Sequence, residues 1–347
     1  MLSVAIIGAG RIGQIRAGVI RRSDHARLVA VADVDHARAE KLAEGSSAQV
    51  YSDWAQVVRR DDVDAIVVCT PTKFHVDVTV AALKAGKHVL CEKPLGRTVD
   101  EARRMFEVAR ASGRVLKTGF NYRHMGHVRK AKELLEAGAL GSLHFLRSRY
   151  GHGGRPGYES EWCTDAELSG GGVLLEQGIH IFDLVRHLLG EPAQLLAQTR
   201  RFYWNFPVVE DNGFCILETV SGQVAQIHVS WTQWVNLFEL EVFGSEGYLR
   251  LEGRDGHYGP QRLIFGKRKQ DHSRPAEELF EFVAPDDSWN CEWQEFHAAI
   301  EEAREPMGSA SDGLRAQQLI EAAYQSASRQ SWVLIPGSEN QPQEANR

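Results

Sequence analysis

The sequence has few cysteines, no large excess of charge and no long apolar run. Its five cysteines lie far apart and form no CxxC pair, so neither a disulfide framework nor a zinc ribbon is indicated. The net charge of −6 gives no electrostatic reason to expect nucleic acid or an anionic membrane as a partner. No stretch approaches the ~18 consecutive apolar residues of a membrane helix, and the N-terminus lacks a basic region followed by a cleavable apolar segment. We therefore predict a reduced, cytoplasmic protein.

A metal site is not indicated either. His124 and His127 would suit one helix face, but no cysteine or carboxylate constellation joins them in the sequence. We therefore predict a protein without a bound metal.

The N-terminal segment contains a glycine motif in an informative context. An apolar run at residues 2–7 comes before it and a helical pattern follows it, which is the setting of a dinucleotide-binding loop. The glycines have distinct tasks: Gly8 permits the tight turn, Gly10 lets the backbone approach a pyrophosphate, and Gly13 lets helix and strand pack closely. The helix N-terminus then receives the anion. The predicted cofactor loop comprises Gly8, Gly10, Arg11, Ile12 and Gly13.

An acidic residue after the second strand indicates which dinucleotide binds. The strand at residues 28–32 ends at Asp33, twenty residues beyond Gly13. A carboxylate at that point hydrogen-bonds the adenosine ribose and repels a 2′-phosphate. Asp35 adds to the repulsion, whereas Arg38 weakens it unless Arg38 is simply an exposed helix residue. The balance favours NAD(H) over NADP(H).

Strands and helices continue to alternate up to about residue 122. Six predicted strands with intervening helices make a doubly wound parallel sheet, a Rossmann domain over residues 1–122. The strands lie at residues 2–7, 28–32, 49–51, 65–69, 87–90 and 115–119. Residues that follow the later strands then lie at the carboxyl edge, where such sheets bind ligands. These are Thr70, Pro71, Lys93 and Asn121.

The stretch Leu90–Leu95, Leu-Cys-Glu-Lys-Pro-Leu, closes one of these strands. Pro94 cannot donate a backbone hydrogen bond, so the strand stops and Lys93 is held at its carboxyl end. The alternative is a solvated loop lysine. His75 opens the helix after the Thr-Pro turn and has two interpretations, a surface residue in the first helical turn or a residue packed near the nicotinamide ribose.

The second half of the sequence has a different pattern of apolar and polar residues, which predicts an α+β domain over residues 123–336. Short alternating runs between residues 195 and 251 indicate a large, open, mostly antiparallel sheet. Helices are predicted at residues 127–137, 292–302 and 312–328, and residues 337–347 form a polar tail. Residues 151–168 have no regular period, and loops of this length are usually functional. There Arg155 is a candidate for a ligand carboxylate or phosphate, with Tyr158 beside it, unless the loop is only a solvated surface.

A glycine-rich turn at residues 169–172 leads into a helix that carries three polar side chains. Glu176 and His180 are four residues apart and share one helix face, while Asp183 is placed to orient the imidazole of His180. An isolated histidine on an apolar helix is more often a satisfied core group than a catalyst. The glutamate and the glycine turn beside it favour a site.

Four motifs along the chain resemble one family. They are Gly8-x-Gly10-x-x-Gly13, Cys69-Thr70-Pro71-Thr72-x-x-His75, Cys91-Glu92-Lys93-Pro94 and Gly119-Phe120-Asn121-Tyr122-Arg123. Together with the 176–183 stretch they are similar to the glucose-fructose oxidoreductase / inositol dehydrogenase / rhizopine catabolism (Gfo/Idh/MocA) family over nearly the whole chain. The resemblance implies a homodimer or homotetramer formed through an uncovered sheet face. It also implies NAD contacts from Thr70, Pro71, His75, Glu92 and Lys93, and substrate contacts from Asn121, Arg123, Glu176 and Asp183.

The resemblance implies an NAD(H)-dependent oxidoreductase that moves a hydride between the nicotinamide and a carbinol or keto carbon of a sugar-like substrate. His180 would accept the hydroxyl proton and Lys93 would stabilise the alkoxide-like oxygen, although Lys93 itself is an alternative proton carrier. The family's sugar and inositol dehydrogenases usually have aspartate at position 176, so Glu176 is a substrate contact rather than a catalyst. Free aldose, inositol and nucleotide-linked sugar all fit. The rival is a catalytically silent NAD-binding regulator of the same fold.

Overall fold

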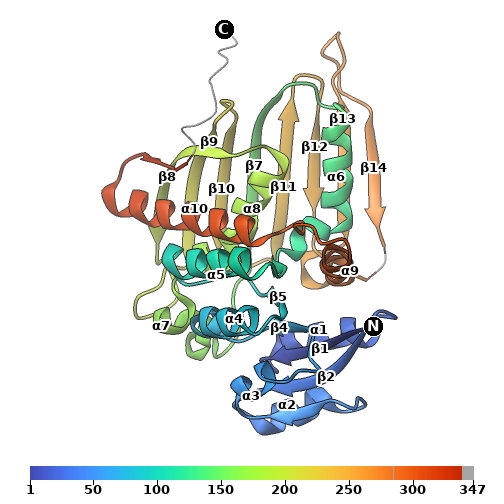
Figure 1. Ribbon diagram of the computed structural model, residues 1–347. Helices are drawn as coiled ribbons and strands as arrows, with labels where there is room; N and C mark the ends of the chain where they lie inside the picture. The colour runs from blue at the N-terminus through green and yellow to red at the C-terminus, as the bar shows by residue number, and fades with distance from the viewer. Residues whose placement is uncertain (284, 338–347) are drawn as a thin grey trace. The chain divides into compact units, whose positions relative to one another are not determined.

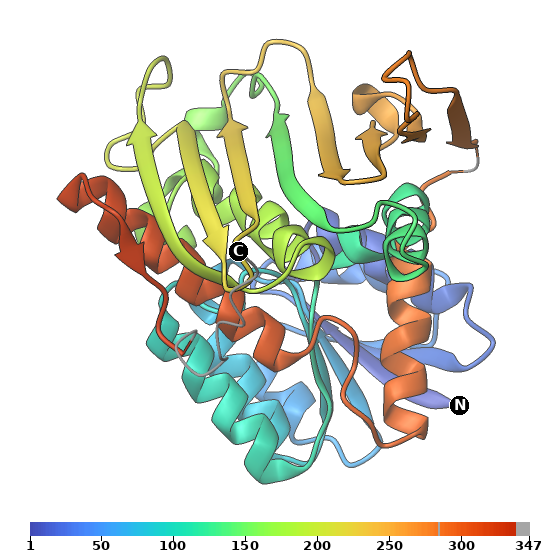
Figure 2. The ribbon, with the colours of Figure 1, turned by 90° about the horizontal axis from the view of Figure 1, so that it is seen from above.

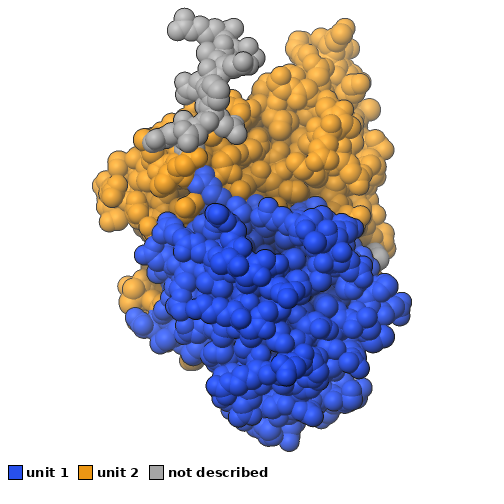
Figure 3. Space-filling model, viewed as in Figure 1, with its two compact units in different colours: residues 1–121, 167–170, 289–317 blue, residues 122–166, 171–288, 318–347 orange. Residues whose placement is uncertain are grey.

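The computed structural model describes residues 1–283 and 285–337, and the chain divides into two compact units (Figure 3). Unit 1 contains residues 1–121, 167–170 and 289–317, and unit 2 contains the remaining described residues. We predicted a single division at residue 122. The leading segment of unit 1 ends one residue earlier, and residues 289–317, which we assigned to the C-terminal domain, belong to unit 1. The predicted tail, apart from Gly337, lies outside the described residues.

Unit 1 is built on a six-stranded sheet in which every pair of neighbours is parallel, in the order β3-β2-β1-β4-β5-β6 (Figure 1). The predicted doubly wound sheet is therefore confirmed. Its two central strands, β1 and β4, are apolar at every position except Ser3, because both faces are covered. The strands are β1 (Leu2–Ile7), β2 (Ala26–Ala32), β3 (Gln49–Tyr51), β4 (Ala65–Val68), β5 (His88–Cys91) and β6 (Leu116–Thr118).

Helices cover both faces of this sheet and divide its core into two apolar clusters. One face packs against α1 (Arg11–Arg21), α2 (His36–Ala43) and α9 (Ser288–Glu301), the last through Trp293 and Phe296. The other face packs against α3 (Trp54–Val58), α4 (His75–Lys84) and α5 (Val99–Ser112). Helix α9 thus completes a core whose other members lie more than two hundred residues earlier, which explains why a contiguous division of the chain missed it.

Unit 2 is built on a nine-stranded sheet in the order β14-β13-β12-β11-β7-β10-β9-β8-β15 (Figure 2). Only the β7–β10 pair is parallel, so the predicted open, mostly antiparallel sheet is confirmed. The strands are β7 (Leu143–Gly151), β8 (Pro192–Arg200), β9 (Asn212–Thr219), β10 (Val224–Ser230), β11 (Leu237–Gly244), β12 (Gly247–Glu252), β13 (Gln261–Lys267), β14 (Glu277–Phe282) and β15 (Val333–Leu334).

We did not predict β13 and β14. Strand β14 forms one edge of the sheet, and most of its side chains are exposed. Its sequence therefore lacks the regular alternation of apolar and polar residues by which a half-buried strand is identified. Helix α6 (Gly126–Glu136) packs against β12, β13 and β14. The segment that leads into α8 (Ile179–Leu188) packs against β7, β9 and β10. Helix α10 (Ala310–Arg329) contributes residues to both units.

Candidate active site

The glycine motif of unit 1 has the geometry of a phosphate-binding loop. Gly8 has a φ of +102°, and a Cβ there would lie 2.5 Å from the carbonyl carbon of Cys69. A Cβ on Gly13 would lie 2.1 Å from the Gly8 oxygen, so neither position tolerates a side chain. A Cβ on Gly10, by contrast, would meet nothing within 4 Å. The open space lies at the start of α1, where no side chain caps the helix, so the residues present fit a dinucleotide pyrophosphate.

Asp33 follows β2 and fastens this loop. One carboxylate oxygen accepts a hydrogen bond from the Ala9 backbone N–H at 2.6 Å, and the other accepts one from Asp35 N–H at 2.9 Å. Arg38 forms an ion pair with Asp35 at 2.9 Å, so its charge is partly neutralised within α2. Asp33 thus has the position that the sequence predicted for a ribose-binding carboxylate.

The Thr-Pro turn after β4 is tied to the Glu-Lys-Pro turn by His75. Its Nδ1 lies 2.8 Å from the Pro94 oxygen and its Nε2 lies 2.8 Å from the Thr70 oxygen. Burial lowers the pKa of His75, and the two carbonyls act in the opposite direction because both can accept a hydrogen bond only from the protonated ring. The side chain is buried, so the surface interpretation of His75 is wrong. Among the described residues Thr70 Oγ1 is buried without a hydrogen-bond partner, as a donor or acceptor for a bound cofactor would be.

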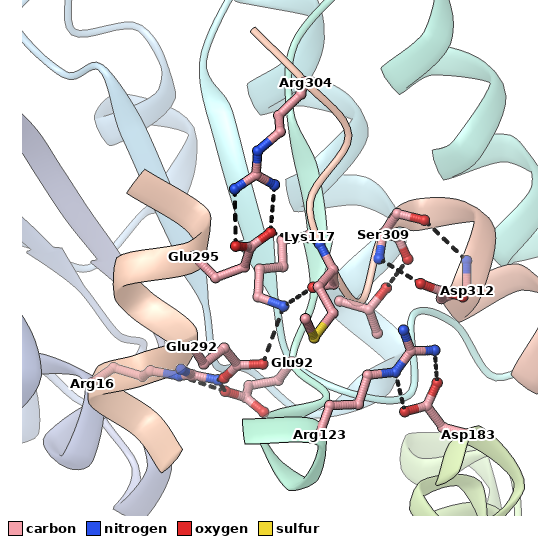
Figure 4. A network of polar contacts seen from close by, with 12 residues as sticks. Arg16, Glu92, Lys117, Arg123, Asp183, Glu292, Glu295, Arg304, Ser309 and Asp312 are labelled. Atoms are coloured by element: carbon pink, nitrogen blue, oxygen red, sulfur yellow. Dashed lines mark hydrogen bonds and ion pairs between the residues drawn. The ribbon is translucent and has the colours of Figure 1, made fainter. Parts of the chain in front are cut away.

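Lys93 follows β5 and is half-buried, and its peptide bond to Pro94 is cis. The preceding Glu92 belongs to a buried ion network (Figure 4). Arg16 of α1 donates from Nε to Glu92 Oε1 at 2.8 Å, and its Nη2 forms ion pairs with the same oxygen at 2.6 Å and with Glu292 Oε2 at 2.7 Å. Lys117 of β6 lies 3.6 Å from Glu292 Oε1. The Glu92 carboxylate is thus paired with Arg16 inside the protein. This pairing holds the backbone directly before Lys93 in place.

Asn121 is buried in the short 3₁₀ turn after β6 and is the last residue of the leading segment of unit 1. The parallel sheet therefore gathers the glycine loop, Asp33, the Thr-Pro turn, Lys93 and Asn121 at the carboxyl ends of its strands.

In unit 2, Arg123 and Asp183 form a buried bidentate pair. Arg123 Nε donates to one Asp183 oxygen at 2.8 Å and Nη2 donates to the other at 2.6 Å. We predicted that Asp183 orients His180. Its described bonds fasten α8 to the turn that follows Asn121, and each charge of the pair is neutralised by the other. The orientation of His180 by Asp183 stays a prediction.

The helix that carries Glu176 and His180 is not a regular α-helix throughout. Residues Leu174–Gly178 are π-helical, and α8 begins only at Ile179. The predicted helix is therefore present, with its first turn in the π form, and single π turns are frequent at functional sites. His180 is buried, and its ring is stacked on Tyr122 with a centroid distance of 3.8 Å and an interplanar angle of 5°.

The predicted substrate loop is partly ordered into short helical turns, 3₁₀ at Tyr158–Ser160 and Trp162–Thr164 and α-helical at α7 (Ala166–Ser169). Arg155 forms a two-point ion pair with Glu161, with Nε 2.6 Å from Oε1. Tyr158 is buried against the ring of Trp231 at 5.2 Å, as a core residue is. At the start of this loop, burial lowers the pKa of His152 to about 4, and the charge of Glu176 acts in the opposite direction.

Sequence reasoning missed a cluster of polar aromatic residues around the His180 ring. The hydroxyls of Tyr122 and Tyr150 lie 2.6 Å apart, and Arg254 donates to both. The Arg254 guanidinium also lies over the ring of Tyr258, 4.7 Å from its centroid. The sequence Gly253-Arg254-Asp255-Gly256 between two strands is a turn signal, but its spacing gives no sign that the arginine turns toward the motif at residues 119–123.

The described residues also bear on metal binding and on membrane crossing. No group of three or more histidine, cysteine or acidic side chains among them is arranged to hold a metal ion. None of the described helices combines the length and the apolar character that a membrane crossing requires.

Comparison with known proteins gives consistent matches in both halves. Residues 2–120 match a family model described as an oxidoreductase family with an NAD-binding Rossmann fold, and residues 128–250 match the GFO/IDH/MocA C-terminal domain. The chain is 29% identical over 335 residues to inositol 2-dehydrogenase of Rhizobium meliloti (strain 1021), covering 95% of this chain and 98% of that protein.

A second curated relative and a solved structure extend the likeness. The chain is 31% identical over 252 residues to myo-inositol 2-dehydrogenase of Thermotoga maritima, covering 71% of this chain and 74% of that protein. Levoglucosan dehydrogenase in complex with NADH superposes with a TM-score of 0.88 over 96% of this chain and 99% of that chain. Its sequence identity is 23%, so it is a likeness of fold alone.

Proposed function

Since this chain belongs to the Gfo/Idh/MocA oxidoreductase family, we propose that it transfers a hydride between NAD(H) and a carbinol or keto carbon of a sugar or cyclitol. One observation carries the proposal. An open glycine cradle at Gly10 and the side chain of Lys93 belong to the same carboxyl edge of one parallel sheet. Relatives named as inositol dehydrogenases support the substrate class.

The cofactor would be held by residues of unit 1. The first turn of α1 would receive the pyrophosphate, Asp33 the adenosine ribose, and Thr70 the nicotinamide end, where its buried Oγ1 is available. The bound nicotinamide supplies the hydride acceptor. The protein's own task is proton transfer, because the hydroxyl proton must leave as the hydride leaves carbon.

We assign this proton to His180 and the stabilisation of the alkoxide-like oxygen to Lys93. Histidine is the side chain whose reference pKa, ~6.5, lies nearest neutral pH, which is the reason for choosing it as the general base. An ammonium group that donates to the reacting oxygen strengthens its interaction as negative charge develops there. Glu176, Asn121, Arg123 and Asp183 are proposed to shape or contact the substrate side. The expected homo-oligomer and the cytoplasmic location stay predictions.

The direct test is NADH absorbance at 340 nm on mixing the protein with NAD and a panel of inositols, aldoses, anhydro sugars and nucleotide sugars. We expect NADH to form with at least one member. NAD binding by calorimetry without turnover on any member, in either direction, would instead favour the catalytically silent regulator.

Asp33 is expected to set the preference for NAD. Replacing it with asparagine keeps an oxygen that accepts from Ala9 N–H but removes the charge that repels a 2′-phosphate. Because hydrogen bonds to charged groups contribute ~1.5–3 kcal/mol, the ratio of kcat/KM for NAD to that for NADP should fall by about 10–100-fold. Steady-state kinetics with both cofactors measures it. An unchanged ratio in a variant that melts like wild type would remove Asp33 from the proposal.

A further inference from the structure

A tight turn between β12 and β13 holds Arg254 in a fixed position. Gly253 has a φ of +76°, and a Cβ there would lie 2.0 Å from the Pro260 oxygen. Asp255, which is not a glycine, has a φ of 63° and a ψ of 175°, a region that is strained for any residue with a side chain. The N–H groups of Arg254 and Asp255 both donate to the Gly259 oxygen, at 3.2 and 2.7 Å. Such strain persists only where the surroundings fix it.

The turn directs one side of the guanidinium at two tyrosine hydroxyls. Arg254 Nη1 donates to Tyr122 and to Tyr150, the second at 2.6 Å. Burial raises the pKa of Tyr122 well above its ordinary value, so this hydroxyl stays protonated and neutral. The two hydrogens of Nη1 are thereby used. Among the described residues, no hydrogen-bond acceptor is bonded to Nε or Nη2, which together form the edge that binds carboxylates and phosphates at two points.

The charge of Arg254 has no ion-pair partner among the described residues. No carboxylate oxygen in that part of the chain lies within 4.0 Å of its nitrogens. Two carboxylates in its neighbourhood, Asp255 and Asp286, accept from Gln261 Nε2 instead, at 2.8 and 3.4 Å. Arg123 and Arg155, by contrast, each have a carboxylate. Arg254 is half-buried, so its charge has lost part of its hydration and no carboxylate replaces that hydration; the position is therefore suited to an anion that arrives from outside.

This guanidinium belongs to the same cluster as the proposed proton acceptor. Tyr122, which receives its hydrogen bond, is the residue on which the His180 ring is stacked. Tyr258, over whose ring it lies, has its pKa raised by burial and, to a smaller degree, by the charge of Glu176. The cation therefore reaches His180 through one intervening residue, Tyr122, and it lies over a tyrosine ring whose hydroxyl is influenced by the charge of Glu176.

We propose that the Nε–Nη2 edge of Arg254 binds an anionic oxygen group on the substrate, either the carboxylate of a sugar acid or the phosphate of a phosphorylated or nucleotide-linked sugar. The proposal rests on the proposed function and narrows its substrate class from sugars in general to sugars that carry an anion. Arg254 is then a specificity-determining residue rather than a proton carrier.

The test measures binding apart from turnover, by titration calorimetry of the full chain saturated with NAD. The probes are matched pairs that differ in one group: glucose with glucuronate, galactose with galacturonate, mannose with mannuronate, glucose with glucose 6-phosphate, and glucose with UDP-glucose. We expect one anionic probe to bind at least 10-fold more tightly than its neutral partner. In Arg254→Met this preference should vanish, while the affinity for the neutral sugar changes less than 3-fold.

Two further variants keep the result interpretable. Arg254→Lys keeps the charge that the tyrosines surround but loses the two-point edge, so it should fold and retain only part of the preference. Arg262→Met on β13 removes an exposed arginine that is paired with Glu281 and should leave the preference unchanged. A preference for the uronates indicates a carboxylate ligand, and a preference for glucose 6-phosphate or UDP-glucose indicates a phosphate. Equal binding of acid and neutral probes by wild type, or an intact preference in Arg254→Met, would overturn the proposal.

NADH formation in the same samples separates this inference from the proposed function. Turnover of neutral sugars without any preference for anions would refute the inference and leave the oxidoreductase. Arg254-dependent binding of an anionic sugar with no NADH formed would refute hydride transfer on these substrates and leave the anion site.

Discussion

Lys93→Met should lower kcat by about 10²–10⁴-fold while the protein still binds NAD. This is the range that a positioned acid or base contributes to a proton transfer, and it corresponds to ~3–5 kcal/mol of transition-state stabilisation. Methionine keeps the length and the apolar stem of the lysine and removes only the ammonium group. The glycine cradle and Asp33 lie on other strand ends, so cofactor affinity should change little.

The other end of the same strand offers a matched control. Lys87, directly before β5, is also buried, and its Nζ donates to the Arg60 oxygen at 2.7 Å. Lys87→Met loses one hydrogen bond, worth ~1 kcal/mol of stability, at the amino edge of the sheet, where no cofactor binds. It should therefore keep near-normal kcat. Steady-state kinetics measures kcat of both variants, and calorimetry measures their affinity for NAD. Near-normal turnover of Lys93→Met would show that the lysine has no part in the mechanism.

The sequence predicted those parts of the site whose chemistry is local. The glycine loop requires particular residues at fixed spacing, because Gly8 and Gly13 leave no space for a Cβ. The strand ends that carry Asp33 and Lys93 were predicted from apolar runs that stop at a polar residue. Parallel strands then bring their carboxyl ends to one edge whatever the helices between them contain. Local rules were sufficient for most of unit 1.

What the sequence did not reveal depends on contacts between distant segments. Glu292 reaches Arg16 only because α9 returns to cover the face of the sheet that α1 occupies. Arg254 is more than a hundred residues from both tyrosines to which it donates. Arg254, just after β12, meets Tyr150 of β7 because β7, β11 and β12 are consecutive in the sheet, an order that no spacing reveals.

The π turn before α8 was missed for a different reason. Glu176 and His180 are four residues apart in sequence whether the backbone is α- or π-helical, so the apolar pattern does not distinguish the two. The turn lies where residues of three strands, β7, β9 and β10, pack against it. Tertiary packing rather than helix propensity therefore decided the local hydrogen-bonding pattern.

Arg16→Met is expected to lower the free energy of unfolding by about 3–5 kcal/mol. The network contains two cations and two carboxylates, and removing Arg16 leaves Glu92 and Glu292 buried with only Lys117 nearby, which is the costly case for a buried ion pair. Burial alone would lower the pKa of Arg16, but the charges of Glu292 and Glu92 outweigh it and raise that pKa above its ordinary value. The guanidinium also lies 4.5 Å from the ring centroid of Trp289, so its loss removes a packing contact.

Urea unfolding followed by circular dichroism measures this loss, and Arg22→Met at the exposed end of the same helix should change stability by less than ~0.5 kcal/mol. The double variant Arg16→Met with Glu292→Gln removes one charge of each sign and should recover part of the loss, because it leaves fewer buried carboxylates uncompensated. A single variant as stable as wild type would mean that water or the remaining lysine compensates the carboxylates. In that case the network would not be what holds Glu92, and with it the Glu-Lys-Pro turn, at the end of β5.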